Sequence, residues 1–301
     1  MRTLVTLAML LTAGCGGAAA AATLPASAQD AEREAVELRI TLPTALVQYA
    51  RTQSVTVRDL GGHQVRVETQ SRLHLRRQGT GEHYSVLRHQ LYDTLEYRSD
   101  GEVEDPGPAM SGIEQNQVRS FVDRRGRIFE GPELAGESSH RQLSAAVLAL
   151  CRLVEPQFPD GPVRVGASWS EPTVLWNTPP LQLAVLEIDR TWTLLGVEGE
   201  GDERRARIGW DVRIRLQPFE ISGVSVSGQG RLEGFSLVSL ADGVSGESAL
   251  DLTMEVGPAG ASDVLPLFRV EAKIRDDVAP APGARRGDLV SGVPPIDPRG
   301  D

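Results

Sequence analysis

The feature that most constrains this chain is a strict alternation of apolar and charged residues. Residues 205–216 read RARIGWDVRIRL. A strand places successive side chains on opposite faces, whereas a helix would mix the two kinds of residue around its circumference. The segment therefore predicts a β-strand with one buried face and one solvated face. The buried face would carry Ala206, Ile208, Trp210, Val212, Ile214 and Leu216.

The same alternation recurs along the chain. Residues 36–42, 65–75 and 250–256 repeat it, and Gly-containing turn signals such as Asp100-Gly101 and Asp242-Gly243 separate the alternating runs. One dry face and one wet face are typical of antiparallel sheets. We expect a mostly β (α+β) fold with about a dozen antiparallel strands, a count whose strand boundaries carry an error of roughly 2–4 residues.

One amphipathic helix is predicted over residues 138–155. Ser139 and Gln142 have the spacing of a capping box, an apolar stripe follows, and Pro156 ends the helix. We expect the helix to pack on the dry face of a sheet and to divide the chain into two β-rich halves. The predicted parts are a β-rich half at 29–135, the helix and its connector at 136–157, a second β-rich half at 158–276 and a disordered tail at 277–301, which is rich in Pro and Gly.

The first residues carry an export signal. Arg2 precedes an apolar run at residues 3–13, and small residues lead to Ala28 before Gln29, which suits cleavage by the ordinary signal peptidase after residue 28. The apolar run is shorter than the ~20 residues that span a bilayer. The expected location is therefore the bacterial cell envelope, either the periplasm or, for a lipoprotein, the outer membrane, with free secretion a weaker expectation.

A lipoprotein signal competes with this cleavage. Residues 11–15 read LTAGC, in which Cys15 would become lipid-modified and N-terminal after cleavage following residue 14. Thr12 stands where Leu is usual. Both alternatives remain open, and only the second would hold the domain to a membrane, through the lipid on Cys15 rather than through a spanning segment.

Charge and cysteine content restrict partners and cross-links. The formal net charge is −10, and an acidic surface disfavours nucleic acid, which requires a concentrated basic patch. With Cys15 in the leader, Cys151 is the single cysteine of the mature chain, so no internal disulfide is expected. Its position beside the apolar stripe of the predicted helix favours a buried structural role over a nucleophilic one.

No recognisable catalytic, cofactor or metal motif accompanies the fold signals. The segment nearest to a nucleophile elbow, residues 223–227 (GVSVS), lacks the closing glycine and alternates like a strand. The histidines lack the spacing of a zinc motif, although His83 and His89 would share a strand face; the others are His63, His74 and His140. We therefore predict no catalytic residues, no cofactor and no metal, and not an enzyme.

A resemblance enters in the middle of the chain. Residues 121–128 (FVDRRGRI) form a turn-like segment, the helix follows, and residues 158–169 (FPDGPVRVGASW) come next. This order resembles a family of exported bacterial proteins and lipoproteins known as a domain of unknown function. The organisation is also distantly similar to periplasmic carriers of lipids and lipoproteins. Physically, Trp169 is expected to cap the dry face of a sheet.

Three functional hypotheses follow. The first is a non-catalytic binding or structural protein of the cell envelope, which holds a lipid, another apolar ligand or an envelope protein against a curved sheet. The second is a hydrolase-type enzyme whose site is assembled between the halves. The third is an outer-membrane barrel, because alternating strands of about ten residues are also its signature.

Overall fold

The computed structural model describes residues 35–40, 47–78, 83–105, 115–134, 157–171, 174–177, 185–221, 223–241, 243, 245–260 and 265–278. These residues form strands and one short 3₁₀ helix, η1 (Gly201–Glu203). The strands are β1 (Val47–Asp59), β2 (Gln64–Gln78), β3 (His83–Ser99), β4 (Glu102–Val103), β5 (Gln115–Asp123), β6 (Ile128–Leu134), β7 (Ser168–Ser170), β8 (Val174–Asn177), β9 (Val185–Glu198), β10 (Arg205–Ile221), β11 (Val224–Ser239), β12 (Ser245–Pro258) and β13 (Phe268–Val278).

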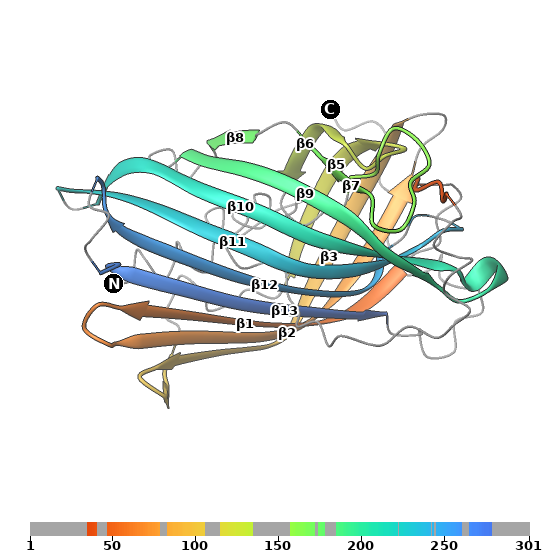
Figure 1. Cartoon of the computed structure of the whole chain (residues 1–301). Helices are drawn as coiled ribbons and strands as arrows, with labels where there is room; N and C mark the ends of the chain where they lie inside the picture. The colour runs from red at the N-terminus through yellow and green to blue at the C-terminus, as the bar shows by residue number, and fades with distance from the viewer. Residues whose placement is uncertain are drawn as a thin grey trace, which may run out of the picture.

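All of these strands belong to one antiparallel sheet. Its order is β6-β5-β3-β2-β1-β13-β12-β11-β10-β9-β7, with β4 paired to β3 and β8 paired to β9 (Figure 1). The mostly β, antiparallel expectation is confirmed. The two predicted halves do not form separate sheets, because β1 pairs with β13 over an unbroken register from Tyr49↔Val278 to Asp59↔Phe268. Alternation identifies a buried face but not the partner strand, so this junction had no signal in the sequence.

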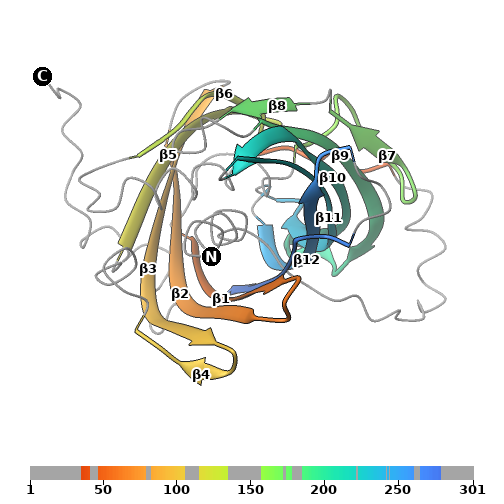
Figure 2. The same ribbon diagram turned by 90° about the vertical axis from the view of Figure 1, so that its left-hand side faces the viewer.

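The sheet curves strongly, with β2, β3 and β5 on one side and β9 to β12 on the other (Figure 2). A side-chain contact shows which face is concave. Arg77 at the end of β2 lies on the same face as Leu73 and Leu75, and its Nη2 donates to the carbonyl oxygen of Gly243 at 3.2 Å. Gly243 lies between β11 and β12, whereas β1 and β13 separate β2 from β12 in the sheet. The apolar face is therefore the inner, concave one.

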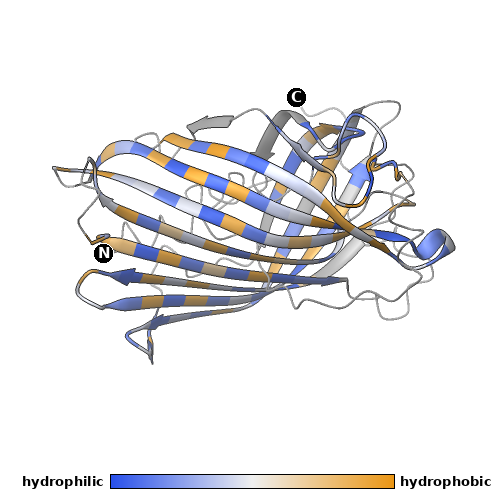
Figure 3. Ribbon diagram, viewed as in Figure 1, coloured by the Kyte–Doolittle hydropathy of each residue, from blue (hydrophilic) through white to orange (hydrophobic). Residues whose placement is uncertain are grey.

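The predicted alternation of residues 205–216 is confirmed in β10. Its six apolar side chains face inward with exposures of 4% or less, and Arg205, Arg213 and Arg215 are exposed on the outer face. Figure 3 shows the corresponding alternation of orange and blue bands along the neighbouring strands. The inner side chains of the sheet form one hydrophobic core, and burial of this kind is a main source of folding stability.

Turn chemistry sets the β3–β4 hairpin as expected. Asp100 and Gly101 join β3 to β4 with φ angles of 49° and 90°. A two-residue turn with both central φ values positive matches the right-handed twist of the flanking strands, and Asp-Gly is a preferred pair for it.

The expected strand at residues 36–42 does not join the sheet. Residues 35–40 are extended, with Val36, Leu38 and Ile40 buried, but they form only one isolated bridge, Val36↔Val163. The amide of Ile40 donates to the carbonyl of Arg124 at 2.7 Å, so the segment crosses strand ends rather than following a free edge. Gly243 allows this crossing, since a Cβ there would lie 2.2 Å from the carbonyl oxygen of Arg39.

Several sequence predictions lie outside the described residues. These are the leader with Cys15, Ala28 and Gln29, the helix at 138–155 with His140 and Cys151, and residues 279–301 of the expected tail. Residues 277 and 278, assigned to that tail, instead complete β13. In the part of the chain that is described, no helix has the length and apolar character needed to cross a membrane.

Candidate functional site

The inner face of the sheet is the first candidate, because it gathers most of the described apolar side chains on one side, apart from a small outer-face cluster of Phe235, Leu237 and Ala249. Its residues include Val55 of β1, Val67 and Leu73 of β2, Val86 of β3 and Val118 of β5, each no more than 6% exposed. The outer face of the same strands carries ion pairs, for example Arg66 with Glu68 at 2.5 Å and Arg231 with Asp211 at 2.9 Å. A sheet built this way keeps its charged face in water and its apolar face away from it.

A belt of polar side chains crosses this apolar face, and we call it the polar belt. The register aligns its members on consecutive strands: Ser236 of β11 lies opposite Ser248, Ser248 opposite Asp276, Asp276 opposite Arg51, and Arg51 opposite Ser71. Gln90 of β3 extends the belt, since its amide Nε2 donates to Ser71 Oγ at 2.9 Å. The belt therefore reaches across six strands at one level of the sheet: β11, β12, β13, β1, β2 and β3.

An ion pair forms the centre of the polar belt. Arg51 donates from Nε to Asp276 Oδ1 at 2.6 Å and from Nη2 to Oδ2 at 2.8 Å, and Ser248 Oγ donates to Oδ2 at 2.9 Å. The two charged side chains are only 10% and 13% exposed. This bidentate geometry offsets part of the desolvation that both charges suffer on an apolar face. With both its oxygens engaged, Asp276 is a structural acceptor rather than a free general base.

Three tryptophans cover one end of the inner face. Trp169 of β7 stacks on Trp192 of β9 with ring centroids 6.5 Å apart, and Trp192 meets Trp210 of β10 edge-on at 6.0 Å. Trp169 Nε1 donates to the carbonyl of Gln157 at 2.6 Å. The expected role of Trp169 as a residue that packs on the dry face is confirmed. Such aromatic pairs contribute about 0.5–1.5 kcal/mol beyond their buried area.

A second buried ion pair lies beside the tryptophans. Arg190 alternates with Ile188 and Trp192 on the inner face of β9, its guanidinium carbon lies 5.6 Å from the Trp192 ring centroid, and it pairs with Glu171. Burial raises the pKa of the Glu171 carboxyl above its ordinary value, although Arg190 and Arg127 act in the opposite direction. A carboxyl with a raised pKa in an aromatic, apolar setting is a typical functional-site signal.

The two ends of the sheet are joined by short segments rather than by a strand ladder in the described residues. The amide of Phe158 donates to the carbonyl of Arg125, between β5 and β6, and Arg125 and Arg127 both pair with Asp160. The chain then returns to β9, where the amide of Gly166 donates to the carbonyl of Leu194 at 2.7 Å. We call this junction of residues 124–127 with 157–171 the seam.

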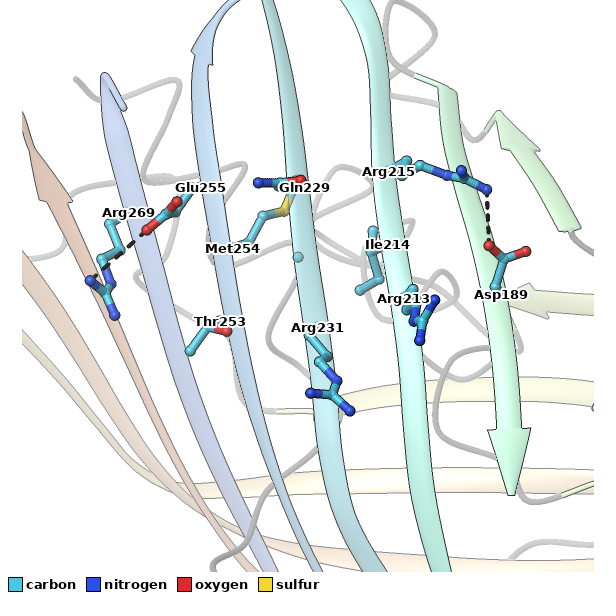
Figure 4. A pocket seen from close by; sticks show the side chains of 11 residues that line it. Asp189, Arg213, Ile214, Arg215, Gln229, Arg231, Thr253, Met254, Glu255 and Arg269 are labelled. Carbon is cyan, nitrogen blue, oxygen red and sulfur yellow. Dashed lines mark hydrogen bonds and ion pairs between the residues drawn. The ribbon is translucent and has the colours of Figure 1, made fainter. Parts of the chain in front are cut away.

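A hollow on the outer face is a further candidate (Figure 4). It has a volume of about 570 Å³ and lies across β9 to β13, between two rows of polar side chains that include Arg213, Arg215, Arg231 and Arg269. Arg215 pairs with Asp189 at 2.9 Å and Arg231 with Asp211, whereas Arg213 has no ion pair with a described residue. The hollow offers guanidinium groups to an oxyanion, but most of them already have carboxylate partners.

None of the three histidine side chains that the structure describes lies on the inner face with the candidate sites. His63 lies in the β1–β2 turn, where its Nδ1 is 3.0 Å from Asp100 Oδ2. His74 and His89 lie on the outer face of β2 and β3, opposite each other. The side chain of His83 lies outside the described ones. Among the described residues no histidine lies on the inner face, and no group of three His, Cys, Asp or Glu side chains is placed to hold a metal ion.

Sequence reasoning missed the four charged residues of the two buried ion pairs, which are Arg51, Asp276, Arg190 and Glu171. Three of them carried a signal, because each occupies the apolar phase of an alternating run: Arg51 with Val55 and Val57, Arg190 with Ile188 and Trp192, and Asp276 with Ile274 and Ala272. A charge in the buried phase marks a residue that must have a buried partner. Residues 223–227, examined as a possible nucleophile elbow, are the turn and first residues of β11.

Comparison with known proteins gives little beyond the sheet itself. No protein-family model matches the chain, and no curated protein matches it. The resemblance of residues 121–169 to an uncharacterised exported family is therefore not confirmed. Among three solved chains that match is the β domain of the Bordetella autotransporter Brka, with 12% identity over 77% of this chain and 99% of that chain and a TM-score of 0.28. What the two share at this level is a large antiparallel sheet.

Proposed function

We propose that this chain is an exported cell-envelope protein that binds a lipid or another largely apolar ligand against the inner face of its sheet and catalyses no reaction. The observation that carries the proposal is the sidedness of the sheet. Apolar residues face inward on a strongly curved surface and charged residues face outward, which is the arrangement of a water-exposed carrier. The export signals at residues 1–28 support the location.

Two polar atoms on the inner face favour a ligand with a few oxygen atoms. Thr69 Oγ1 and Trp192 Nε1 are buried without a hydrogen-bond partner. A buried donor left in this state costs about 1–3 kcal/mol, and a carbonyl or hydroxyl oxygen of an amphiphile would remove that cost. The seam supplies a route by which the ligand reaches the inner face. Short local segments open at a lower free energy than a paired strand ladder does.

Catalysis has less support than binding. The carboxylate of Asp276 is fully engaged by Arg51 and Ser248, and the three described histidine side chains lie on the outer face or in a turn. No described nucleophile has a base within hydrogen-bond reach on the inner face, apart from Ser248 and the engaged Asp276.

A second candidate is the outer-membrane barrel, which long strands in one curved antiparallel sheet favour. In such barrels the apolar side chains face outward to lipid and the interior is polar. Here the outer face of β10 carries Arg205, Arg207, Asp211, Arg213 and Arg215. At the bilayer midplane each outward Arg would cost about 2–4 kcal/mol. Extraction with alkaline carbonate separates the barrel from a carrier without a lipid anchor, because an integral barrel stays with the membrane whereas such a carrier is released.

Ligand binding is tested on the chain expressed with its own leader and purified without detergent. Organic-solvent extraction followed by mass spectrometry should recover a lipid in near-stoichiometric amount, and a fluorescent fatty acid should compete for the same site. Thr69→Val should weaken that binding several-fold, and the matched outer-face control Thr56→Val should not. Recovery of no lipid at any occupancy, together with no fatty-acid binding, would contradict the proposal.

A mass measurement of the mature protein resolves the anchoring. A lipid-modified N-terminal Cys15 predicts a mass increased by acyl chains, whereas cleavage after Ala28 predicts an unmodified chain that begins at Gln29.

A further inference from the structure

A pair of histidines lies on the outer face of the sheet, away from the proposed ligand site. His74 of β2 and His89 of β3 are directly opposite in the antiparallel register. Their ring centroids are 6.1 Å apart and the rings are perpendicular, at 89°. Side chains directly opposite on one face of a sheet have Cβ atoms about 4.5–5.5 Å apart, a spacing that lets two imidazoles approach a common point between the strands.

The environment of His74 favours the neutral, ligating form of its ring. Partial burial, followed by the nearby His89 and Arg72, lowers the pKa of His74 below its ordinary value. A neutral imidazole has a free nitrogen lone pair, and metal ions compete with protons for that lone pair.

One ring nitrogen of His74 lacks the interaction that such atoms normally have. Its Nε2 is shielded from solvent and has no hydrogen-bond partner. Polar atoms shielded from water are rarely left without a partner in folded proteins, and a bound ion can supply the missing interaction. His63 offers the contrast within the same chain, since its Nδ1 meets the Asp100 carboxylate and its side chain is 62% exposed.

We propose that His74 and His89 form a binding site for a transition-metal ion that prefers imidazole, with Cu²⁺ bound more tightly than Ni²⁺ or Zn²⁺. That order follows from the general affinity series for nitrogen ligands. Among the described residues no third His, Cys, Asp or Glu joins the pair, so water completes the coordination and the ion is exchangeable. The same row continues to Gln48 of β1, opposite His74, and to Gln117 of β5, opposite His89.

The surroundings also set what the site excludes. Arg72 lies on the same face of β2 as His74, where it pairs with Asp93 at 2.8 Å, and Arg119 lies on the outer face of β5, opposite Leu87. Because Asp93 is engaged by Arg72 and no group of three described His, Cys, Asp or Glu side chains is placed to hold an ion, the site is unsuitable for Ca²⁺ or Mg²⁺, which require oxygen ligands. The site is therefore selective by ligand type rather than by charge.

The test is a calorimetric titration of the purified full mature chain with Cu²⁺, Ni²⁺ and Zn²⁺ at neutral pH. Electron paramagnetic resonance identifies the ligands of bound Cu²⁺. One Cu²⁺ should bind with a spectrum that shows two imidazole nitrogens. His74→Ala and His89→Ala should each weaken binding by at least about tenfold, the loss that even an outer-shell change causes in known metal sites. His63→Ala is the matched control and should bind as the parent does.

Two outcomes would overturn the proposal. One is Cu²⁺ affinity that is unchanged in both His74→Ala and His89→Ala, and the other is a parent spectrum with a single imidazole nitrogen. Should an alanine variant fail to fold, His74→Gln and His89→Gln keep a polar side chain of similar reach at each position and carry the same expectation. Binding of Ca²⁺ in preference to Cu²⁺ would contradict the assigned metal class.

Discussion

Strands β10 and β1 belong to the same sheet but present different inner faces. β10 has an apolar side chain at each inner position from Ala206 to Leu216, whereas β1 combines Val55 and Val57 with the buried Arg51 and Gln53. The difference shows that the inner face is not a uniform core. Packing volume sets the stability of the β10 side, and the completeness of a polar network sets that of the β1 side.

The largest effect is expected from breaking the central pair of the polar belt. Asp276→Leu leaves Arg51 as a buried, uncompensated charge and should lower the free energy of unfolding by about 4 kcal/mol. The double variant Arg51→Met with Asp276→Leu should recover most of this loss, because a buried ion pair and a well-packed apolar pair differ little in stability. Urea denaturation of the three proteins measures both values. Equal losses in the single and double variants would show that the pair acts through packing alone.

A slightly smaller loss of stability is expected from truncating a buried side chain of β10. Ile208→Ala creates a cavity on the inner face and should cost about 3 kcal/mol, within the range for such truncations. Arg213→Ala on the outer face of the same strand is the control, and as a surface substitution it should change stability by no more than about 0.5 kcal/mol. Comparable losses at the two positions, measured by denaturant unfolding, would contradict the assignment of inner and outer faces.

The edge of the polar belt should respond less. Ser71→Ala removes the acceptor of the Gln90 amide and should cost about 1–2 kcal/mol, since the amide stays buried without a partner. Ser71→Ala combined with Gln90→Leu should be less destabilising than the single change. Thermal unfolding of the pair tests this, and strict additivity of two losses would exclude a shared hydrogen bond.

The ion pair beside the tryptophans should respond to pH. Because the folded-state pKa of Glu171 is raised, its neutral form stabilises the fold below the ordinary value of 4.5, and that contribution is lost as the pH rises through the folded-state pKa. Glu171→Gln should therefore gain stability relative to the parent as the pH rises from 4.5 upward. Unfolding series from pH 4 to pH 7 measure this difference, with Glu233→Gln on the outer face as control. A constant difference would mean that Glu171 is not buried as described.

The smallest change in stability is expected from substituting a charged residue on the outer face. Arg213 of β10 lies between Arg231 of β11 and Asp189 of β9, so the repulsion from one neighbouring strand opposes the attraction from the other. Arg213→Glu reverses both interactions at once and should therefore change the free energy of unfolding by no more than about 0.5 kcal/mol at low salt, with the difference reduced further at high salt. Arg213→Gln removes both interactions and should also leave the stability nearly unchanged. A gain or loss of more than about 1 kcal/mol in Arg213→Glu, measured by denaturant unfolding, would show that one of the two neighbours dominates.

The sequence predicted the strands but not the order in which they pair. The alternation at residues 205–216 predicted both the strand and its buried face, because successive side chains of a strand point to opposite faces of the sheet. The pairing of β1 with β13 joins residues more than two hundred positions apart, as Arg51 and Asp276 are, and no local pattern encodes such a partner.

Less of the candidate site than of the fold could be predicted from the sequence, for a related reason. Arg51, Arg190 and Asp276 each interrupt an apolar phase, so their burial was detectable from the sequence. Their partners were not detectable, since each partner lies on another segment of the chain. Likewise, His74 and His89 could be placed opposite each other only once the register of β2 and β3 was known.

The pairing of β1 with β13 also has a consequence for how the molecule is made. The centre of the sheet consists of the first and last strands, and its edges, β6 and β7, come from the middle of the chain. Nascent hairpins can form early, but the ladder between β1 and β13 must wait until the final segment emerges, and contacts of such long sequence separation form slowly. A chain that crosses a membrane from its amino end would thus reach the far side before it could complete its own architecture, which leaves an interval in which chaperones have access to unpaired edges.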